Sequence, residues 1–376
     1  MRILIFTTAY LPFVGGAELA IKEITDRLSP VEFSFDLITL NLDGKQKKEE
    51  RVGNVRVTRL SCPKILFPFA AFMRASNVHR KEPYTHVWSV MASYGGFAGL
   101  FFKHHFPKVP FILTLQEGDS FSHIYRRVFF IWPLFKMIFT RADRITAISN
   151  YLAEWAKRMG ARCPIEVIPN GFDAVWFDKN QTPLPLGNRE RFKSMQEFRN
   201  GDKILITTSR LVHKNAIDIV IKALKYLATS IHFLILGDGP LRSDLESLAK
   251  QLKLSERVHF AEQVPNTTII QYLNISDIFV RPSRSEGFGT SFVEAMAAGV
   301  PVVATPVGGI PDFLKDGETG LFCTVDDPED LARKVTQLLE NEQLRKRLMS
   351  NASKVVREKY EWSRIVEKMR SVLTGM

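Results

Sequence analysis

Cysteine is scarce in this chain of 376 residues, and its three cysteines do not form a recognisable set. Cys62, Cys163 and Cys323 lie far apart, with no pair of the CxxC type. This spacing argues against a disulfide framework or a zinc site and is typical of a reduced, cytoplasmic protein. Long apolar runs are also missing, because none reaches the length that a transmembrane helix requires.

The chain has fewer acidic than basic residues. It contains 40 Asp and Glu and 51 Lys and Arg, which give a net charge of +11. This surplus indicates an anionic partner, which could be a phosphorylated ligand, a nucleic acid or an acidic membrane surface. No RNA- or DNA-binding signature appears in the sequence, so nucleic acid is not expected. The hydrophobic fraction of 45% and the charged fraction of 24% fit a folded protein.

The two halves of the chain begin alike. Residues 3–28 and 204–227 each read as a short apolar strand, a Thr-rich end, a loop and an amphipathic helix. This order opens a doubly wound parallel sheet, and its repetition predicts an α/β protein of two Rossmann-like domains that face each other across a cleft.

The polar, proline-containing stretch between the halves predicts the domain boundary. We expect an acceptor-binding domain over 1–175, a linker over 176–201 and a donor-binding domain over 202–360. The last helix, about 361–376, is expected to pack back on the first domain.

A dinucleotide fingerprint of the GxGxxG type is absent, but single glycine motifs follow the predicted strands. In "PFVGGAELA", Gly15 and Gly16 would let a phosphate approach the N-terminus of a helix, or they form a plain tight turn. In "LGDGP", Gly237 marks either a turn or a place where a flat ring lies against the backbone. Neither motif is specific alone.

Two charged motifs are more informative. In "TTSRLVHKN", Arg210 and Lys214 follow a buried strand and could bind one diphosphate, the alternative being a solvated basic loop. In "SEGFGTSFVEAMAAG", Glu286 lies on a loop and Glu294 about one turn into a helix that Thr290 or Ser291 could cap. Carboxylates bind vicinal hydroxyls, so sugar recognition is predicted; the alternative is a surface glutamate and a helix-dipole glutamate.

These motifs, in this order, resemble the retaining GT-B glycosyltransferases of family 4, the "glycosyl transferases group 1" type. The resemblance covers nearly the whole chain and is densest over 204–322. It implies transfer of a hexose from a UDP- or GDP-sugar to a saccharide or lipid-linked acceptor. No DxD motif is present, and the resemblance implies an enzyme without metal or cofactor.

The resemblance also implies roles for individual residues. Arg210 and Lys214 would neutralise the diphosphate, Glu286 would hold the donor sugar, and Glu294 would hold the ribose. Further donor contacts would come from glycines and loop amides, namely Gly15, Gly16, Gly237, Phe288, Gly289 and Thr290. Where many relatives have a histidine, this chain has Gln116 or Glu117, and Asn215 replaces a usual glycine. Candidate acceptor-side residues are therefore Gln116, Glu117 and Asp119.

The segment 124–144 is rich in aromatic and basic residues. Ile124, Val128, Ile131, Phe135 and Ile138 would form one apolar helical stripe, which Pro133 should interrupt. The segment is either core or a surface that binds an anionic membrane, and in the second case the protein lies at the inner face of the membrane. A sugar-nucleotide epimerase and a non-catalytic basic scaffold stay open as alternatives.

Overall fold

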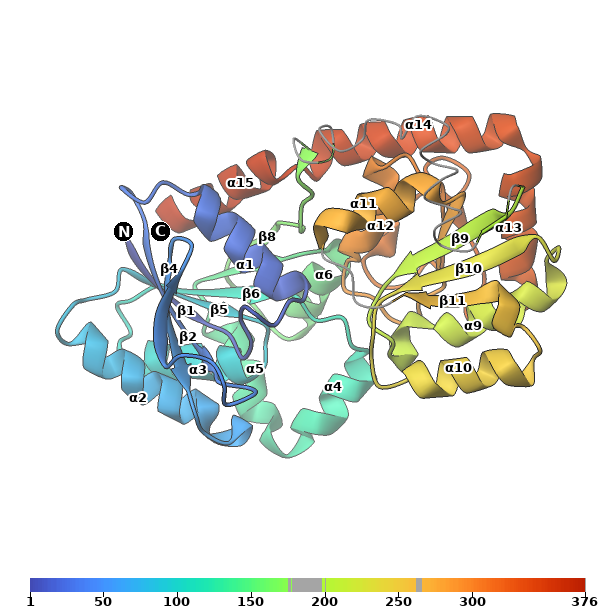
Figure 1. Cartoon of the computed structure of the whole chain (residues 1–376). Helices are drawn as coiled ribbons and strands as arrows, with labels where there is room; N and C mark the ends of the chain where they lie inside the picture. Colours follow the sequence, from blue (N-terminus) through green and yellow to red (C-terminus); the bar gives the residue numbers. More distant parts are fainter. Residues whose placement is uncertain (175–176, 178–197, 200, 262–265, 376) are drawn as a thin grey trace. The chain divides into compact units, whose positions relative to one another are not determined.

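The computed structural model describes residues 1–174, 177, 198–199, 201–261 and 266–375 (Figure 1). The chain divides into two compact units. Unit 1 comprises Met1–Gly171 with Trp362–Met376, and unit 2 comprises Phe172–Glu361. Most of the predicted linker, 176–201, lies outside the described residues. Each unit is a parallel-sheet α/β domain, which confirms the predicted fold class.

Unit 1 contains an eight-stranded sheet in the order β3-β4-β2-β1-β5-β6-β7-β8. Its strands are β1 (Arg2–Phe6), β2 (Ser34–Leu40), β3 (Glu49–Val52), β4 (Val55–Leu60), β5 (His86–Val90), β6 (Phe111–Leu115), β7 (Arg144–Ala147) and β8 (Ile165–Val167). All neighbours pair in parallel except β3, which runs antiparallel to β4 at the edge. The sequence did not predict β3, because its four residues "EERV" carry little apolar signal.

Helices cover the sheet of unit 1. They are α1 (Gly16–Arg27), α2 (Phe67–His79), α3 (Tyr94–His105), α4 (Phe121–Val128), α5 (Trp132–Thr140), α6 (Asn150–Arg158) and α15 (Trp362–Thr374). The last of these, α15, packs against α1 (Figure 1). Its apolar residues, among them Ile365 and Met369, join one core with the buried side chains of α1 and β1. Burial of this apolar stripe holds the C-terminal helix on unit 1.

Unit 2 contains a six-stranded, fully parallel sheet in the order β11-β10-β9-β12-β13-β14. Its strands are β9 (Lys203–Thr208), β10 (Ile231–Leu236), β11 (Val258–Ala261), β12 (Ile278–Arg281), β13 (Val302–Ala304) and β14 (Leu321–Phe322). The central strands are short apolar runs because helices cover both of their faces. The sequence predicted all six.

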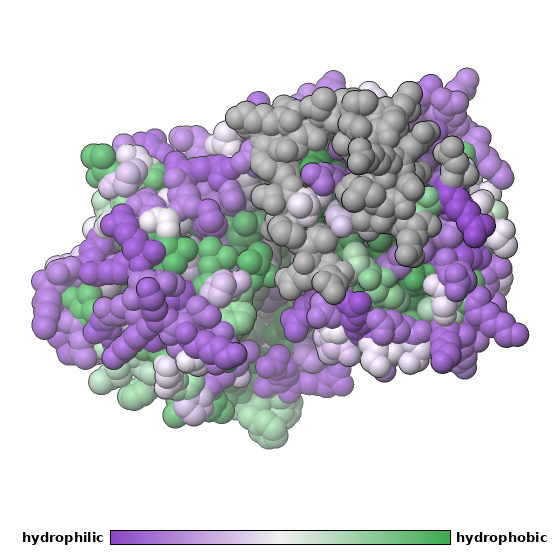
Figure 2. All heavy atoms as spheres, viewed as in Figure 1, coloured by the Kyte–Doolittle hydropathy of each residue, from purple (hydrophilic) through white to green (hydrophobic). Residues whose placement is uncertain are grey.

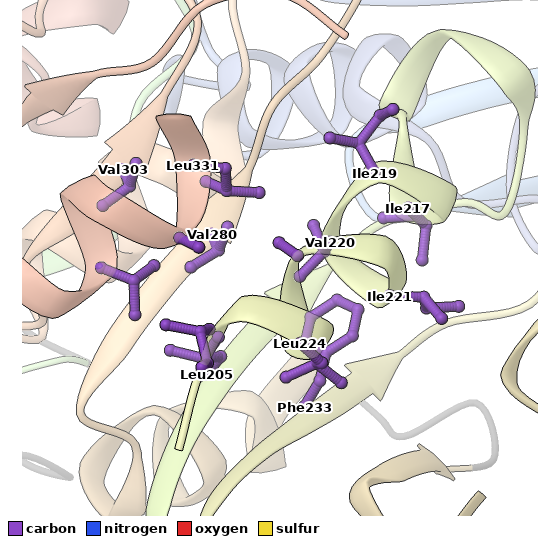
Figure 3. Close-up of a cluster of buried hydrophobic side chains, with 14 of the residues drawn as sticks. Leu205, Ile217, Ile219, Val220, Ile221, Leu224, Phe233, Val280, Val303 and Leu331 are labelled. Atoms are coloured by element: carbon purple, nitrogen blue, oxygen red, sulfur yellow. The ribbon is translucent and has the colours of Figure 1, made fainter. Parts of the chain in front are cut away.

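The main helices of unit 2 are α9 (Ile217–Ala223), α10 (Arg242–Gln251), α11 (Asn266–Ile275), α12 (Thr290–Ala297), α13 (Pro328–Glu340) and α14 (Glu342–Lys359). Figure 3 shows part of the core that they form with the sheet, in which side chains of α9 meet those of β9 and β10. Val220, Leu205 and Phe233 are fully or almost fully buried there. This packed layer leaves the loops at the strand ends to carry the polar chemistry.

The aromatic segment 124–144 does not form the single apolar stripe that the sequence predicted. A 3-10 turn, η2 (Phe129–Ile131), separates α4 from α5, and Pro133 lies in the first turn of α5. Proline is tolerated there but not within a continuous helix, so the predicted interruption is confirmed. Phe135 and Ile138 are completely buried, whereas Ile131 is exposed. The segment is therefore part core and part surface.

Each sheet has a point at which the order of its strands reverses. In unit 1 this point lies between β1 and β5, and in unit 2 it lies between β9 and β12. Loops that leave adjacent strands at such a point turn to opposite faces of the sheet and leave a hollow at the carboxyl edge, where α/β proteins bind ligands. Among the candidate site residues, Gly16 follows β1, Arg210 and Lys214 follow β9, and Glu286 follows β12.

Candidate functional site

The loop that follows β9 carries the two predicted cations. Arg210 is exposed two residues beyond the strand, and Lys214 lies half-buried in the 3-10 helix η3 (His213–Asn215). Asn215 is buried, and its Nδ2 donates to the carbonyl oxygen of Arg210 at 2.6 Å. This bond closes the loop on itself, so that both cations extend from a fixed backbone.

Arg284 connects this loop to the one that follows β12. The amide of Arg284 donates to the carbonyl oxygen of Lys214 at 2.7 Å, and its Nη1 donates to that of His213 at 2.8 Å. Its guanidinium also pairs with both carboxylate oxygens of Asp218 and with Asp326. A planar guanidinium suits such multiple bonds. The two loops at the reversal point of unit 2 are therefore bonded into one assembly.

Glu286, on the second loop, has both carboxylate oxygens engaged. Its Oε2 accepts from Nη2 of Arg281 at 2.8 Å, and its Oε1 accepts from the amide of Gly287 at 3.1 Å. Arg281 ends β12 and is only 5% exposed. Each carboxylate oxygen can accept more than one hydrogen bond, so Glu286 keeps capacity for a ligand. Its orientation, however, is set by a buried cation.

Helix α12 begins after Gly289, whose φ of 96° lies in the left-handed region. The predicted cap by Thr290 or Ser291 is wrong, because no side chain caps this helix. The hydroxyl of Ser291 instead accepts from Arg281 at 2.8 Å. The N-terminal amides of α12, including that of Thr290, thus lie beside the Glu286 loop, where an anion is favoured.

Glu294 lies in the second turn of α12 and is half-buried. Burial raises the pKa of Glu294 to about 7, and the nearby positive charge of Arg281 opposes this rise. Arg281 is in electrostatic reach of Glu286 as well as Glu294. The two predicted glutamates therefore share one buried cation, which places them in the same part of unit 2.

Two glycines permit close approaches between backbones in unit 2. A Cβ on Gly308, whose φ is +57°, would lie 1.7 Å from the carbonyl oxygen of Glu286. A Cβ on Gly237, whose φ is +145°, would lie 2.1 Å from the carbonyl oxygen of Ser209. Packing of neighbouring loops explains both glycines. The donor contact that the sequence predicts for Gly237 stays a prediction.

The side chain of Phe288 belongs to the core of unit 2. It is 1% exposed, and its ring packs against the rings of Phe313 and Tyr360 at centroid distances of 5.3 and 5.5 Å. Only the backbone of Phe288 is therefore available to a ligand, in line with the backbone role that the sequence predicted for it. The ring anchors the loop that carries Glu286.

In unit 1, Gly15 and Gly16 are exposed at the N-terminus of α1, as the sequence predicted. The carbonyl oxygen of Gly16 accepts from Nδ2 of the buried Asn170 at 3.5 Å. A Cβ on Gly15 would lie 2.6 Å from Oε2 of Glu18. Burial raises the pKa of Glu18, while bonds from its own amide and that of Gly15 oppose the rise. The Glu18 carboxylate thus accepts hydrogen bonds from amides at the start of α1.

The acceptor-side candidates follow β6 of unit 1. Gln116 is buried, Glu117 is half-buried and Asp119 is exposed. Oε1 of Glu117 accepts from the amide of Ala92, whereas its Oε2 is inaccessible and has no hydrogen-bond partner within the described residues. Burial raises the pKa of Glu117 to about 7, although backbone bonds oppose the rise. Glu117 is therefore a carboxyl group that changes its charge near neutral pH.

Sequence reasoning missed three residues that organise the site of unit 2. Arg281, Arg284 and Gly308 fix the orientation of Glu286 and the path of its loop. One signal was visible for Arg281, because a charged residue ends the otherwise apolar strand "IFVR". The bonds of Arg284 to Asp218 and Asp326 join residues 66 and 42 positions away, and no local pattern indicates them.

Comparisons with known proteins agree with this geometry. The family model described as "Glycosyltransferase Family 4" matches residues 14–176, and the model described as "Glycosyl transferases group 1" matches residues 188–355. An uncharacterized glycosyltransferase of Methanocaldococcus jannaschii is 28% identical over 96% of this chain and 95% of its own length. N-acetyl-alpha-D-glucosaminyl L-malate synthase of Bacillus anthracis is 30% identical over 62% of this chain and 59% of its own length.

A solved structure confirms the predicted GT-B fold. HepE of Anabaena, in complex with UDP-glucose, superposes with a TM-score of 0.82 at 20% identity and covers the full length of both chains. Sequence identity at this level shows a shared fold. The ligand has to be inferred from the residues of this chain.

Proposed function

This chain belongs to the GT-B glycosyltransferases of family 4, and we propose that it transfers a hexose from a UDP- or GDP-sugar with retention of anomeric configuration. The acceptor in this proposal is a saccharide or a lipid-linked saccharide, as in the synthesis of cell-surface polysaccharide or glycolipid. Support comes from a relative in Mycolicibacterium smegmatis, which is named a GDP-mannose-dependent mannosyltransferase, and from HepE, whose structure contains UDP-glucose.

The observation that carries the proposal is the bonded pair of loops at the reversal point of unit 2. Arg210 and Lys214 extend from one loop, and Glu286 extends from the other. In the proposal, the two cations bind the diphosphate and stabilise the charge that grows as the anomeric bond breaks. Glu286 accepts from hydroxyls of the sugar, and Glu294 accepts from those of the ribose.

The cations also supply the positive charge for which other enzymes use a metal ion. No cluster of three His, Cys, Asp or Glu side chains that could hold a metal lies within the described residues. We propose that Arg210 and Lys214 compensate the diphosphate charge without a divalent cation, because a guanidinium and an ammonium can both pair with phosphate oxygens. Transfer that persists in excess EDTA would agree with this assignment, whereas full loss with recovery on added Mg²⁺ would contradict it.

The proposed reaction takes place on one face of the sugar. The bond from the anomeric carbon to the diphosphate oxygen breaks, and a bond to the acceptor oxygen forms on the same face. The leaving phosphate oxygen takes the acceptor proton, so this route needs no side-chain base. It therefore tolerates Gln116 or Glu117 at the place where many relatives have a histidine, although the amide of Gln116 cannot act as a base.

Peripheral attachment to an anionic membrane is part of the proposal. Phe129 and Phe130 in η2 are 71% and 95% exposed, and Arg126 and Arg127 are exposed in the preceding turn of α4. Figure 2 shows apolar residues on the surface at the bottom of the view, where Figure 1 places this part of the chain. Exposed aromatic rings with a basic rim favour insertion into an anionic interface. Among the described helices, none has the length and hydropathy to span a bilayer.

The proposal is tested with a panel of nucleotide sugars, measured first by calorimetry and then by product analysis with saccharide acceptors. Arg210→Ala or Lys214→Ala is expected to abolish transfer, since each removes a charge from the leaving diphosphate. Glu294→Ala is expected to weaken nucleotide binding. Unchanged transfer in all three variants would refute the assignments. Formation of an epimerised sugar nucleotide without acceptor would instead identify an epimerase.

A further inference from the structure

The buried guanidinium of Arg281 is the feature of unit 2 that the sugar-transfer chemistry does not yet explain. Its Nη2 donates to Glu286 and its Nη1 to Ser291, both at 2.8 Å, and Nη1 also donates to the carbonyl oxygen of Thr208 at 3.3 Å. The guanidinium carbon lies 4.2 Å from the centroid of the Phe292 ring, a cation–π distance. Arg281 thus joins the ends of β9 and β12 to the first turn of α12.

Burying this charge has a cost to the fold. Desolvation lowers the pKa of Arg281, and its Nε has no hydrogen-bond partner within the described residues. A buried ion pair is often no more stabilising than well-packed apolar residues of the same volume. The three residues that precede Arg281 in β12, "IFV", are buried and apolar. Stability alone therefore does not account for an arginine at this position.

The position of Glu286 accounts for it. Arg281 fixes Oε2, and the amide of Gly287 fixes Oε1. The backbone of Glu286 is held as well, because its carbonyl oxygen accepts from the amide of Gly309 at 3.1 Å. Without Arg281, the backbone of Glu286 would keep its position, but the carboxylate could rotate about the side-chain bonds.

We propose that Arg281 is a positioning residue, which holds the Glu286 carboxylate in the orientation that accepts hydrogen bonds from the donor sugar. This inference rests on the proposed function, in which Glu286 binds that sugar. Arg281 is 5% exposed and its Nη2 bonds the carboxylate, so we assign it a role through Glu286 and not on the substrate. A fixed carboxylate loses less freedom when the sugar binds, which favours recognition of the sugar moiety.

The test compares two dissociation constants for each variant, that of the nucleotide sugar and that of the matching nucleoside diphosphate. The probes are UDP-glucose with UDP, or GDP-mannose with GDP, whichever pair the wild type binds. The ratio reports on the sugar, because the two ligands share the nucleoside and differ at the terminal phosphate and its sugar. Arg281→Lys keeps the charge of the site, so the extra negative charge of the free diphosphate does not account for a changed ratio in that variant. One charge-assisted hydrogen bond is equivalent to about a tenfold change in this ratio.

We expect Glu286→Gln and Arg281→Lys each to change the ratio by about tenfold. The double variant should change it no further, since both substitutions remove the same interaction. Arg281→Met should have at least the effect of Arg281→Lys. Arg333→Lys, at an exposed arginine of α13, is the matched control and should leave the ratio unchanged.

Thermal unfolding of each variant separates loss of fold from loss of orientation. Arg281→Lys keeps the charge and is the variant expected to fold if Arg281→Met does not. A normal ratio in folded Arg281→Lys, with a changed ratio in Glu286→Gln, would overturn the positioning role alone. Additive effects in the double variant would overturn it too. A wild type that binds no nucleotide sugar would instead remove the proposed function.

Discussion

Replacing Glu294 with glutamine should flatten the pH dependence of stability of unit 2. Burial raises the pKa of Glu294 from an ordinary value of 4.5 to about 7 in the folded chain. Between these two values the folded state binds a proton that the unfolded state does not bind. The free energy of unfolding therefore falls as the pH rises through this window, and it is flat on either side.

The magnitude follows from the size of the shift. One pKa unit is equivalent to about 1.4 kcal/mol. The free energy of unfolding of the wild type should therefore fall by up to about 3 kcal/mol between about pH 4.5 and about pH 7. Glu294 is half-buried, which makes this an upper figure because solvent screens part of the effect. Glu294→Gln cannot ionise and should lack this loss.

The assay is urea denaturation of the ligand-free protein at about pH 5 and about pH 8, where the group is mostly protonated and mostly ionised. Glu340→Gln, at the exposed end of α13, is the matched control for the loss of one carboxylate. Glu117, whose pKa burial raises to about 7, should produce the same sign of effect in unit 1. Equal losses of stability in wild type and Glu294→Gln would refute the reasoning.

Three further outcomes can be measured directly. Gly308→Ala should lower the free energy of unfolding by on the order of 3 kcal/mol, because a Cβ would meet the carbonyl oxygen of Glu286. Gly299 also has a positive φ but lies in open space, so Gly299→Ala should cost about 1 kcal/mol in the same denaturation assay. Asn215→Ala should cost about 1–2 kcal/mol and weaken nucleotide-sugar affinity in calorimetry, since the Arg210 carbonyl loses its donor. Phe130→Ser should weaken binding to vesicles of anionic lipid by roughly tenfold or more without changing the melting temperature, because the ring is 95% exposed. Unchanged vesicle binding would contradict the membrane surface at η2.

Much of the fold and part of the candidate site could be predicted from the sequence. Apolar runs such as "ILITT" and "IFV" indicate buried parallel strands because residue hydropathy reports burial directly. Charged and glycine motifs directly after these strands indicated Arg210, Lys214 and Glu286. The edge strand β3 escaped prediction because a polar, half-exposed strand has no such pattern. The cap of α12 was wrongly predicted because the helix begins after Gly289, which leaves Thr290 and Ser291 inside its first turn, and the Ser291 hydroxyl accepts from Arg281.

The sequence by itself therefore determined most of the segments that become strands and helices, and which loops carry charge. Tertiary structure alone decided which charges meet. Arg281 reaches Glu286 and Ser291, and Arg284 reaches Asp218, through folding of the chain around the reversal point between β9 and β12. The physical reason is that propensity and periodicity act over a few residues. A hydrogen bond between groups 66 residues apart depends on strand order, burial and the path of two loops.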